Sequence, residues 1–217
     1  MEIIAKAEKN KLSLYNFIKR IFDIVISVIA IIFLVPISIC IKFLFIISKD
    51  FGPIFFIQER IGKDGKIFKM YKYRTMRINA EEELTQILKN NKKLDEEYKL
   101  NKKLRCDPRV TRFGKFLRKS SIDELPQFIN VLKGEMSFVG PRPYLLTEKE
   151  EMKEYYYEIT SVKPGITGKW QVSGRNNVSF QDRIRIDTNY CKSKNIIEDL
   201  KIILLTIVKV IIKEGAN

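Results

Sequence analysis

The sequence contains no histidine, and this absence removes several kinds of chemistry at once. Ser-His-Asp and Cys-His catalysis both need an imidazole, as does every histidine-containing metal site. Cysteine is scarce, because Cys40, Cys106 and Cys191 are far apart and no two have C-x-x-C spacing. This pattern argues against disulfides and zinc and favours a reducing compartment. Any catalysis must therefore use carboxylates and cations.

Positive charge, by contrast, is abundant. The 217 residues are enough for one domain with attached segments. They include 40 Lys and Arg against 26 Asp and Glu, which leaves a net charge of +14. We therefore expect anionic partners, such as nucleic acid, membrane phospholipid or phosphorylated small molecules. Charge alone does not choose among them.

A long apolar stretch from Ile21 to Ile47 follows a basic segment, residues 1–20. It exceeds the roughly 20 apolar residues that cross a bilayer, and no A-x-A-like site follows it as in a signal peptide. Pro36 divides it into arms of about 15 and 11 residues, each too short for a hydrocarbon core about 30 Å thick. Basic residues flank both ends, which disfavours a spanning helix. We predict a re-entrant helix-break-helix hairpin over residues 21–49; a spanning helix and a buried core helix are the alternatives.

Residues 52–76 carry two aromatic and β-branched runs on either side of a glycine-containing turn. The Asp64-Gly65 pair in this turn predicts a β-hairpin. The second run interleaves Lys72 and Arg74 with aromatic residues. This interleaving is found in nucleic-acid binding. It equally describes a half-buried strand whose exposed face meets phosphates or lipid headgroups, and we favour that interpretation.

A charge-rich segment, residues 79–104, has neither glycine nor proline and predicts one or two surface helices. A basic run then follows over residues 105–119 and includes Arg112 and Arg118. Such runs are usually solvated faces. This one directly precedes an acidic pair, which favours a phosphate site.

We expect the chemistry in residues 120–143, where Asp123 and Glu124 precede apolar residues with helical spacing and Gly134 ends the helix. The positive end of a helix dipole favours two ionised carboxylates in its first turn. The alternative is a capping box, S-x-x-E, formed by Ser121 and Glu124. A capping box does not account for Asp123.

The C-terminal third gives weaker signals. Residues 148–157 predict a helix. Residues 163–177 predict a glycine-rich loop, in which Trp170 would offer a stacking surface and Arg175 would offer hydrogen-bond donors. Residues 196–213 predict a helix that is apolar apart from a narrow polar stripe. It is either a core helix or an interfacial membrane helix.

Three motifs carry a family resemblance: SIDELPQ at Ser121 to Gln127, GPRP at Gly140 to Pro143 and KPGITG at Lys163 to Gly168. With them the chain resembles the bacterial sugar transferases, monotopic polyprenyl-phosphate phosphoglycosyl transferases that begin capsule, exopolysaccharide, O-antigen and glycoprotein glycan assembly. The resemblance runs from about Phe17 to the C-terminus and covers the catalytic module, without the extra N-terminal membrane helices of larger members. The insert at residues 79–104 resembles the branch that transfers hexose 1-phosphates.

The resemblance implies a two-step exchange. Asp123 would attack the β-phosphorus of a UDP-sugar, release UMP and hold the sugar phosphate until polyprenyl phosphate collects it, with Glu124 as acidic partner. It also implies Mg²⁺ as cofactor, held in part by Asp123. Arg74 and Arg112 are further phosphate candidates because they lie in basic runs. The basic residues that the resemblance assigns to phosphates are Lys72, Arg118, Arg142 and Arg175.

Some members place serine before the helix-breaking proline, whereas Val35 stands there in this chain. The hydroxyl that could satisfy backbone groups freed at the break is missing at that position, and Ser38 is the candidate replacement. An aspartate nucleophile, in turn, agrees with the absence of histidine, because an aspartate is ionised at neutral pH without a base.

Together these features predict a mainly helical α+β fold with a basic segment (1–20), a re-entrant membrane segment (21–49) and a membrane-associated catalytic domain (50–217). The predicted fold also contains a small β-hairpin and amphipathic interfacial helices.

The expected partners are a UDP-sugar, polyprenyl phosphate and membrane lipid, with no nucleic acid; a homo-oligomer is left open. The expected location is the inner (cytoplasmic) membrane, with the catalytic domain on its cytosolic face. The sugar is not determined, although galactose or glucose is favoured. The competing hypothesis, a non-catalytic basic membrane protein, leaves the carboxylate pair unexplained.

Overall fold

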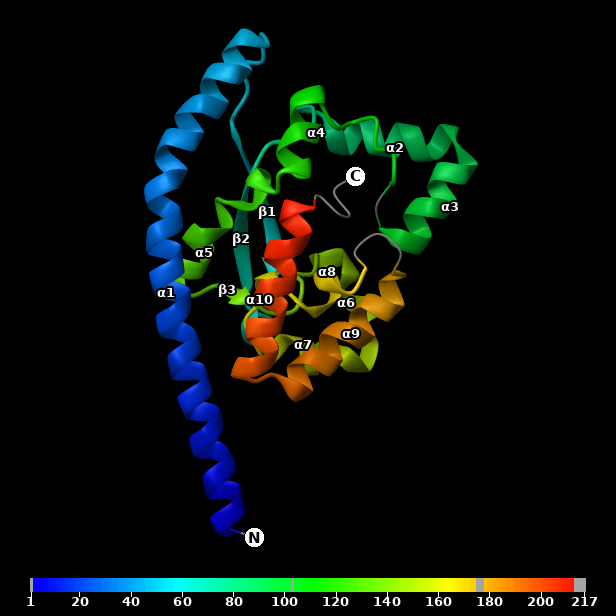
Figure 1. The fold of residues 1–217 in the computed structure, drawn as a ribbon. Coiled ribbons are helices and arrows are strands. Elements are labelled where there is room, and N and C mark those ends of the chain that lie inside the picture. Colours follow the sequence, from blue (N-terminus) through cyan, green and yellow to red (C-terminus); the bar gives the residue numbers. More distant parts are fainter. Residues whose placement is uncertain (1, 103, 175–177, 213–217) are drawn as a thin grey trace.

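The computed structural model describes residues 2–102, 104–174 and 178–212, with side chains from residue 10 onward (Figure 1). One long helix, α1 (Glu2–Ile47), runs along one side of a mainly helical body that carries two small sheets. The predicted α+β class is therefore confirmed.

The predicted hairpin is present. Strands β1 (Phe55–Ile61) and β2 (Ile67–Tyr73) pair antiparallel, and the 3-10 turn η1 (Lys63–Gly65) joins them. In that turn Asp64 and Gly65 both have positive φ, 56° and 74°. Aspartate and glycine tolerate this left-handed region better than most residues, which is why this pair marks the turn.

The charged segment after the hairpin forms two surface helices, α2 (Ala80–Asn90) and α3 (Lys92–Asn101), which extend away from the body in Figure 1. Helix α4 (Arg112–Lys119) then returns to the body, and the Thr111 side chain caps it by accepting from the backbone N–H of Gly114. The prediction of one or two surface helices is confirmed.

The following elements build the centre of the body. Strand β3 (Ser137–Val139) pairs parallel with β4 (Gly165–Thr167), so that Ser137 faces Gly165 and Val139 faces Thr167. The helix expected over residues 148–157 is present, broken into short turns. The elements between β3 and the C-terminus, β4 aside, are η3 (Leu146–Glu148), α6 (Lys149–Met152), η4 (Lys153–Tyr155), α7 (Tyr156–Thr160), α8 (Lys169–Val172), α9 (Phe180–Ser193) and α10 (Ile196–Ile211).

The break expected at Pro36 is not formed, because α1 is one continuous helix with the proline inside it. A proline removes one backbone hydrogen bond and costs a helix about 3 kcal/mol. Leu34 before the proline and Phe45 after it are buried in one cluster with Tyr73 of β2. The Tyr73 hydroxyl also lies 2.6 Å from Ser38 Oγ and 3.4 Å from the Leu34 carbonyl oxygen. Since one cluster holds both arms, they stay in line, and the helix-break-helix prediction is wrong.

Polar anchors tie the first half of α1 to the body. Asp23 is buried, and its Oδ1 accepts a hydrogen bond from the Phe138 N–H at 2.8 Å. Asp199 of α10 accepts one from the Tyr15 hydroxyl at 2.9 Å. Arg20 donates to two carbonyl oxygens near the end of α5 (Gln127–Lys133), at 2.7 and 2.9 Å. These contacts explain why Asp23 and Arg20 stand in and beside an apolar stretch.

Both ends of the apolar part of α1 therefore contact the same body. From Tyr15 to Phe45 the docked length is about 45 Å at 1.5 Å per residue. By length and composition α1 could cross a membrane. Docked along this length, however, it cannot cross a hydrocarbon core about 30 Å thick while the body stays on one side.

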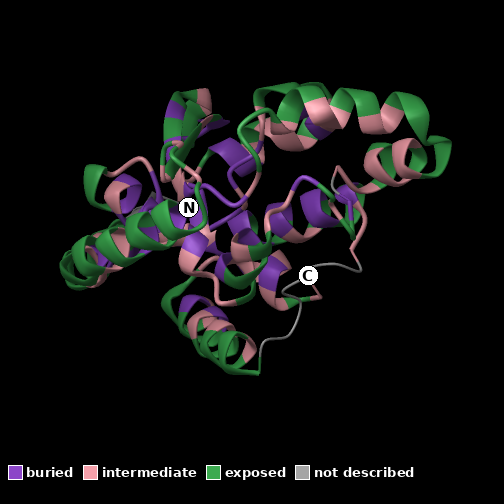
Figure 2. Ribbon diagram, turned by 90° about the horizontal axis from the view of Figure 1, so that it is seen from above, coloured by how far each residue is buried: buried purple, intermediate pink, exposed green. Residues whose placement is uncertain are grey.

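The outer face of α1 is apolar and exposed, and so is much of α10. Figure 2, viewed from above, shows the exposed colour along the outer side of α1. The most exposed apolar residues of the two helices are Phe17, Ile32, Phe33, Val35, Ile39, Phe43 and Ile47 on α1, and Ile197, Leu204 and Ile211 on α10. Such faces fit the predicted interfacial helices.

Candidate functional site

Asp123 and Glu124 lie in one tight 3-10 turn, η2 (Ile122–Glu124), between α4 and α5. Ser121 has φ of 56° and makes no side-chain cap, so the capping-box alternative is not formed. Pro126 occupies the position just before α5, where its missing N–H costs no hydrogen bond. Gly134 ends α5 with φ of 84°, as predicted. The acidic pair is therefore held by a turn of its own.

Asp123 is buried, with 9% of its surface exposed. Burial and then the charge of Glu124 raise the pKa of Asp123 to about 6, while the positive charges of Lys72 and Arg118 act in the opposite direction. Perturbation of this kind is typical of catalytic carboxylates, although structural ion pairs produce it too. Asp123 is thus a carboxylate shielded from water whose ionisation falls just below neutral pH.

The hairpin supplies the cation beside this pair. Lys72 Nζ lies 2.8 Å from Glu124 Oε1. The buried Asn130 of α5 fixes the spacing, because its side chain accepts from the Tyr71 N–H at 3.1 Å and donates to the Lys69 carbonyl oxygen at 2.7 Å. Helix α5 and strand β2 are therefore hydrogen-bonded together next to the carboxylates.

The second cation, Arg118, comes from α4. Its Nε donates to Thr75 Oγ1 at 3.0 Å; burial lowers the pKa of Arg118, and the charge of Asp123 acts against that. Gly114 allows α4 to approach, since a Cβ at this position would lie 1.9 Å from the Thr75 carbonyl oxygen. The orientation of Arg118 thus depends on backbone contact between α4 and residue 75.

A basic turn around Arg142 lies beside the hairpin and is fixed from two sides. Asp187 of α9 is fully buried, and its Oδ2 accepts from the Arg142 N–H at 3.1 Å and the Tyr144 hydroxyl at 2.9 Å. Burial raises the pKa of Asp187 to about 7, against the effect of these hydrogen bonds. Arg60 of β1 donates to the Pro143 carbonyl oxygen at 3.0 Å. The turn is therefore held rigidly.

Arg60, Arg142 and Arg183 form an arginine cluster behind this turn. Arg183 is fully buried, and its guanidinium carbon lies 4.6 Å from the centre of the Trp170 ring. Within the described residues, none of its three guanidinium nitrogens has a hydrogen-bond partner. Burial and then the charge of Arg142 lower the pKa of Arg183 to about 10 and that of Arg60 to about 9. Glu148 lies 3.7 Å from Arg142, and the charges of Glu148 and Asp187 both act on the pKa of Arg183. Buried donors short of acceptors suit an anion.

The two groups of charges are electrostatically linked. The charges of both Arg142 and Glu124 act on the pKa of Arg60. The structure thus brings three predicted site residues close to Asp123, namely Lys72, Glu124 and Arg118. It places a fourth, Arg142, in the neighbouring arginine cluster.

The remaining predicted phosphate residues have other positions. Arg74 points toward the end of α1, where it pairs with Asp50 at 2.7 Å and covers the ring of Phe45 at 4.8 Å. Arg112 is exposed on α4. Arg175 lies outside the described residues. Trp170, expected as a stacking surface, does stack on arginine.

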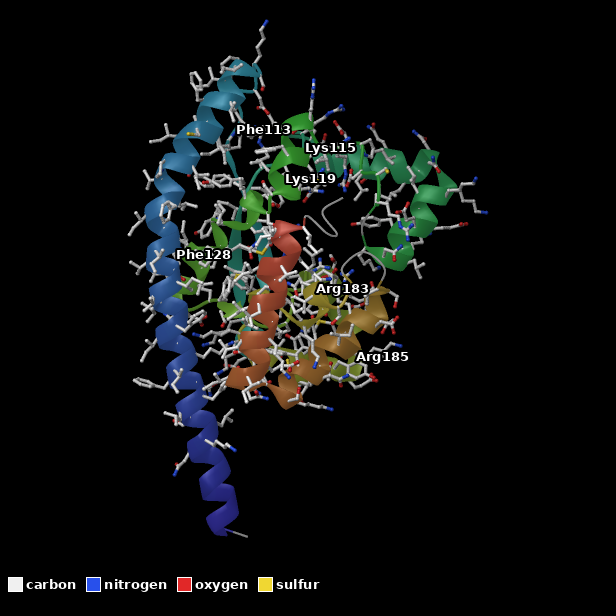
Figure 3. The ribbon with its side chains drawn as sticks, in the orientation of Figure 1. Phe113, Lys115, Lys119, Phe128, Arg183 and Arg185 are labelled. Carbon is white, nitrogen blue, oxygen red and sulfur yellow. The ribbon has the colours of Figure 1, made fainter. Side chains whose placement is uncertain are left out.

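Three residues of the site were not predicted from the sequence: Arg60, Arg183 and Asp187. A signal was present in α9, where Asp187 continues the buried stripe that includes Ile184. A carboxylate on an apolar stripe is costly unless it is bonded. Figure 3 shows the labelled Arg183 and Arg185 on the same helix, but Arg185 has a side chain 67% exposed.

The carboxylates of the site could contribute to a metal site. Among the described residues, no group of three or more His, Cys, Asp or Glu side chains could hold one. Asp123 and Glu124 do offer two adjacent carboxylates, one of them with a pKa raised by burial and by the other's charge. Mg²⁺ commonly takes one or two protein carboxylates and completes its shell with water and substrate phosphates. The pair fits a magnesium ion that binds together with a nucleotide.

Comparison with known proteins gives a consistent result. The family model described as bacterial sugar transferase matches residues 14–213. Galactosyl transferase CpsE of Streptococcus agalactiae is 48% identical over 172 residues, which is 79% of this chain and 37% of the relative. The undecaprenyl-phosphate galactose phosphotransferase of Salmonella typhimurium is 41% identical over 201 residues, 93% of this chain and 42% of the relative.

A shorter relative is matched over most of its length. The exopolysaccharide production protein ExoY of Sinorhizobium fredii is 42% identical over 201 residues, 91% of this chain and 87% of the relative. The chain therefore spans less than half of the two larger relatives and most of ExoY.

Proposed function

The chain belongs to the bacterial sugar transferase family, and we propose that it transfers a sugar 1-phosphate from a UDP-sugar to polyprenyl phosphate. The observation that carries this proposal is the buried Asp123 between Lys72 and Arg118, with a pKa raised by burial to about 6. The names of relatives support the substrates. One of them, 36% identical over 210 residues, is the UDP-glucose:undecaprenyl-phosphate glucose-1-phosphate transferase of Escherichia coli.

In the first step an ionised oxygen of Asp123 attacks the β-phosphorus of the UDP-sugar. A new phosphorus–oxygen bond forms, the bond from the β-phosphorus to the bridging oxygen breaks, and UMP leaves with that oxygen. The sugar phosphate stays on the aspartate. No histidine base is needed, because a carboxylate with a pKa of about 6 already lacks its proton at neutral pH.

In the second step a phosphate oxygen of polyprenyl phosphate attacks the same phosphorus. The bond to Asp123 breaks, polyprenyl-diphosphate-sugar leaves, and the carboxylate is restored. The net reaction converts UDP-sugar and polyprenyl phosphate into UMP and the lipid-linked sugar, the first membrane step of capsule, exopolysaccharide or related glycan assembly.

Both steps bring an anion to an anion, so positive charge must lie near the phosphorus. Lys72 and Arg118 supply it at Asp123, and Arg142 with the arginine cluster supplies it for the remaining phosphates. Mg²⁺, held by Asp123 with Glu124 alongside, would add Lewis-acid stabilisation of the transferred phosphoryl group. Galactose and glucose are the sugars that the relatives' names favour.

The proposed location is the cytosolic face of the inner membrane. Helix α1 would lie along the membrane surface with its exposed apolar face immersed, since its inner face is docked on the body. The exposed face of α10 would lie in the same interface.

This arrangement predicts that both ends of α1 face one side of the membrane. In a variant without native cysteines, single cysteines replacing Asn10 and Ser48 should both react with an impermeant thiol reagent added from the cytosolic side. The reason is that anchors near Arg20 and Phe45 hold both ends on one body. Labelling from opposite sides would rule out the in-plane helix.

The function is tested with purified protein in lipid nanodiscs that contain undecaprenyl phosphate. A panel of UDP-sugars is assayed for nucleotide release, with and without Mg²⁺. We expect UMP from one preferred donor, in multiple turnovers that require both Mg²⁺ and the lipid. Release of UDP would instead indicate ordinary glycosyl transfer and would contradict the proposal.

The acidic limb of the pH profile should report the ionisation of Asp123. Activity is expected to fall as the pH drops through about 6, because protonation removes the nucleophile. Glu124→Gln removes a charge that raises this pKa, so the limb of its residual activity should move to lower pH. Lys72→Met removes a charge that lowers it, so the limb should move to higher pH, each by roughly one unit.

The measurement is kcat/KM for UMP release between acidic and mildly alkaline pH. Both substitutions will reduce the rate, so the opposite directions of the two shifts are the informative result. Shifts in the same direction would mean that the limb belongs to another group.

A further inference from the structure

An open groove of about 450 Å³ lies just past the C-terminal end of α1, where the chain leaves that helix for the hairpin. The charged side chains that line it are Lys49, Asp50, Arg74, Arg77 and Glu83. The proposed reaction uses none of them. Since α1 would lie in the membrane interface, the groove would open beside the lipid head groups.

One edge of the groove is apolar and exposed. Phe51 is 76% exposed and Ile78 is 68% exposed, and they follow the outer face of α1, on which Ile47 is 62% exposed. The two segments meet at Gly52, where an added Cβ would lie 3.0 Å from Ile78 Cδ1. Residues distant in the sequence therefore form one apolar edge, and large side chains this exposed suit contact with lipid chains.

Part of the groove is fixed by ionic contacts. Arg74 pairs with Asp50 at 2.7 Å and donates to the Pro53 carbonyl oxygen at 2.7 Å. Asp50 also accepts from the Gly52 N–H at 3.1 Å. The charge of Arg74 is therefore already matched by a carboxylate.

The rim carries two cations whose main chains are held and whose side chains are exposed. The Arg77 N–H donates to the Arg109 carbonyl oxygen at 3.1 Å, but the Arg77 side chain is 64% exposed and lies 3.6 Å from Glu83. The Lys49 N–H donates to the Ile46 carbonyl oxygen at 2.9 Å, and its side chain is exposed. Charge-assisted hydrogen bonds to a phosphate can replace a contact as long as that of Arg77 with Glu83.

The charge balance of the lining selects the kind of phosphate. Three cations, Lys49, Arg74 and Arg77, stand against the two carboxylates, which leaves one positive charge in excess. A phosphodiester carries one negative charge and balances this excess, whereas a phosphate monoester carries about −1.5 to −2. A zwitterionic head group leaves the excess uncompensated. Asn79 also lines the groove, and its side chain forms no cap with α2, so it is available to an uncharged hydroxyl.

We infer that this groove binds one anionic phospholipid of the bilayer, with its phosphodiester at the cationic rim and its acyl chains over Phe51 and Ile78. The lipid is a bound membrane component and takes no part in phosphoryl transfer. Its site lies where the end of α1, the base of the hairpin and the start of α2 meet, so the lipid ties these segments to the bilayer. The inference goes beyond the proposed function and rests only on the interfacial placement of α1.

A photoreactive phosphatidylglycerol tests the site directly. It has a single phosphodiester charge and a hydroxyl-bearing head group. In phosphatidylcholine nanodiscs at high salt, where general attraction to the +14 chain is screened, it should crosslink to the segments around Phe51 and Ile78. Phosphatidylglycerol should compete, and inorganic phosphate, which has no acyl chain, should not.

The rim cation is tested by substitution. In Arg77→Ala the apparent affinity for phosphatidylglycerol should fall about tenfold, as expected for the loss of one charge-assisted hydrogen bond. Arg77→Lys keeps the charge and should recover part of the affinity. Lys92→Ala, an equal loss of charge on exposed α3, should leave the affinity unchanged. Unchanged affinity in Arg77→Ala, or an equal loss in Lys92→Ala, would overturn the site.

The competitors identify the ligand. Displacement by inorganic phosphate would make the groove a site for a soluble anion, and equal displacement by undecaprenyl phosphate would remove the preference for a phosphodiester. Either result would overturn the phospholipid assignment.

The outcomes also separate this inference from the proposed function, because crosslinking requires no turnover. Selective crosslinking in a protein that releases no UMP would leave the lipid site in place and remove the transferase proposal. UMP release without crosslinking at the groove would do the reverse. In nanodiscs of phosphatidylcholine and undecaprenyl phosphate alone, Arg77→Ala should release UMP within about twofold of the parent rate, since one exposed side chain is removed.

Discussion

Asp123→Asn is expected to reduce UMP release by about 10³-fold or more, because an amide oxygen cannot form the covalent bond that a carboxylate forms. The substitution changes shape very little. It should also remove labelling of the protein by a UDP-sugar that carries radioactive phosphorus in the β position. Both measurements use the full chain in nanodiscs.

The stability of Asp123→Asn should not fall. The folded-state pKa of Asp123 is raised by burial, so its ionisation at neutral pH costs folding free energy, and a neutral amide avoids that cost. An unchanged or higher melting temperature would show that lost activity is not lost folding. Asp95→Asn, on the surface helix α3, is the matched control and should keep full activity. Full turnover by Asp123→Asn would show that the nucleophile is another group.

Gly114→Ala is expected to cause a large loss of stability, about 3 kcal/mol or more. The added Cβ would lie 1.9 Å from the carbonyl oxygen of Thr75 and 2.8 Å from its Cα. These are backbone atoms and cannot rotate away, so α4 must move off the end of β2. Since Arg118 donates to the Thr75 hydroxyl, that movement also displaces a cation beside Asp123.

The measurement is the apparent melting temperature in detergent together with UMP release. Lys115→Ala, at an exposed position of the same helix, controls for a change in helix sequence and should stay within about 0.5 kcal/mol of the parent. Equal melting temperatures for the two variants would mean that the helix relaxes without cost. In that case the close approach at residue 114 would not position Arg118.

Local patterns in the sequence were sufficient for several elements. Runs of aromatic and β-branched residues on either side of Asp64-Gly65 predicted the hairpin, and the helical spacing that ends at Gly134 predicted α5. These signals act within one or two turns of chain, where backbone conformation and side-chain spacing decide the structure.

The interpretation of Pro36 shows the limit of local reasoning. A proline in an isolated apolar helix favours a break, and the arm lengths agreed with a hairpin. The continuous helix depends instead on Tyr73, which lies far along the chain and contacts both Leu34 and Ser38. Those packing and hydrogen-bond contacts outweigh the local preference, and no pattern near Pro36 reports them.

The candidate site, too, was determined partly by local sequence and partly by tertiary contacts. The sequence by itself determined an apolar N-terminal segment, a histidine-free chemistry and a carboxylate pair just ahead of a helix and next to basic residues. Only the tertiary structure decided that Arg74 pairs with Asp50 rather than with Asp123 or Glu124. It also decided that Arg60 and Arg183 lie close to Arg142. The reason is physical: charge type and periodicity are local properties, whereas the neighbours of a buried charge depend on how distant segments close around it.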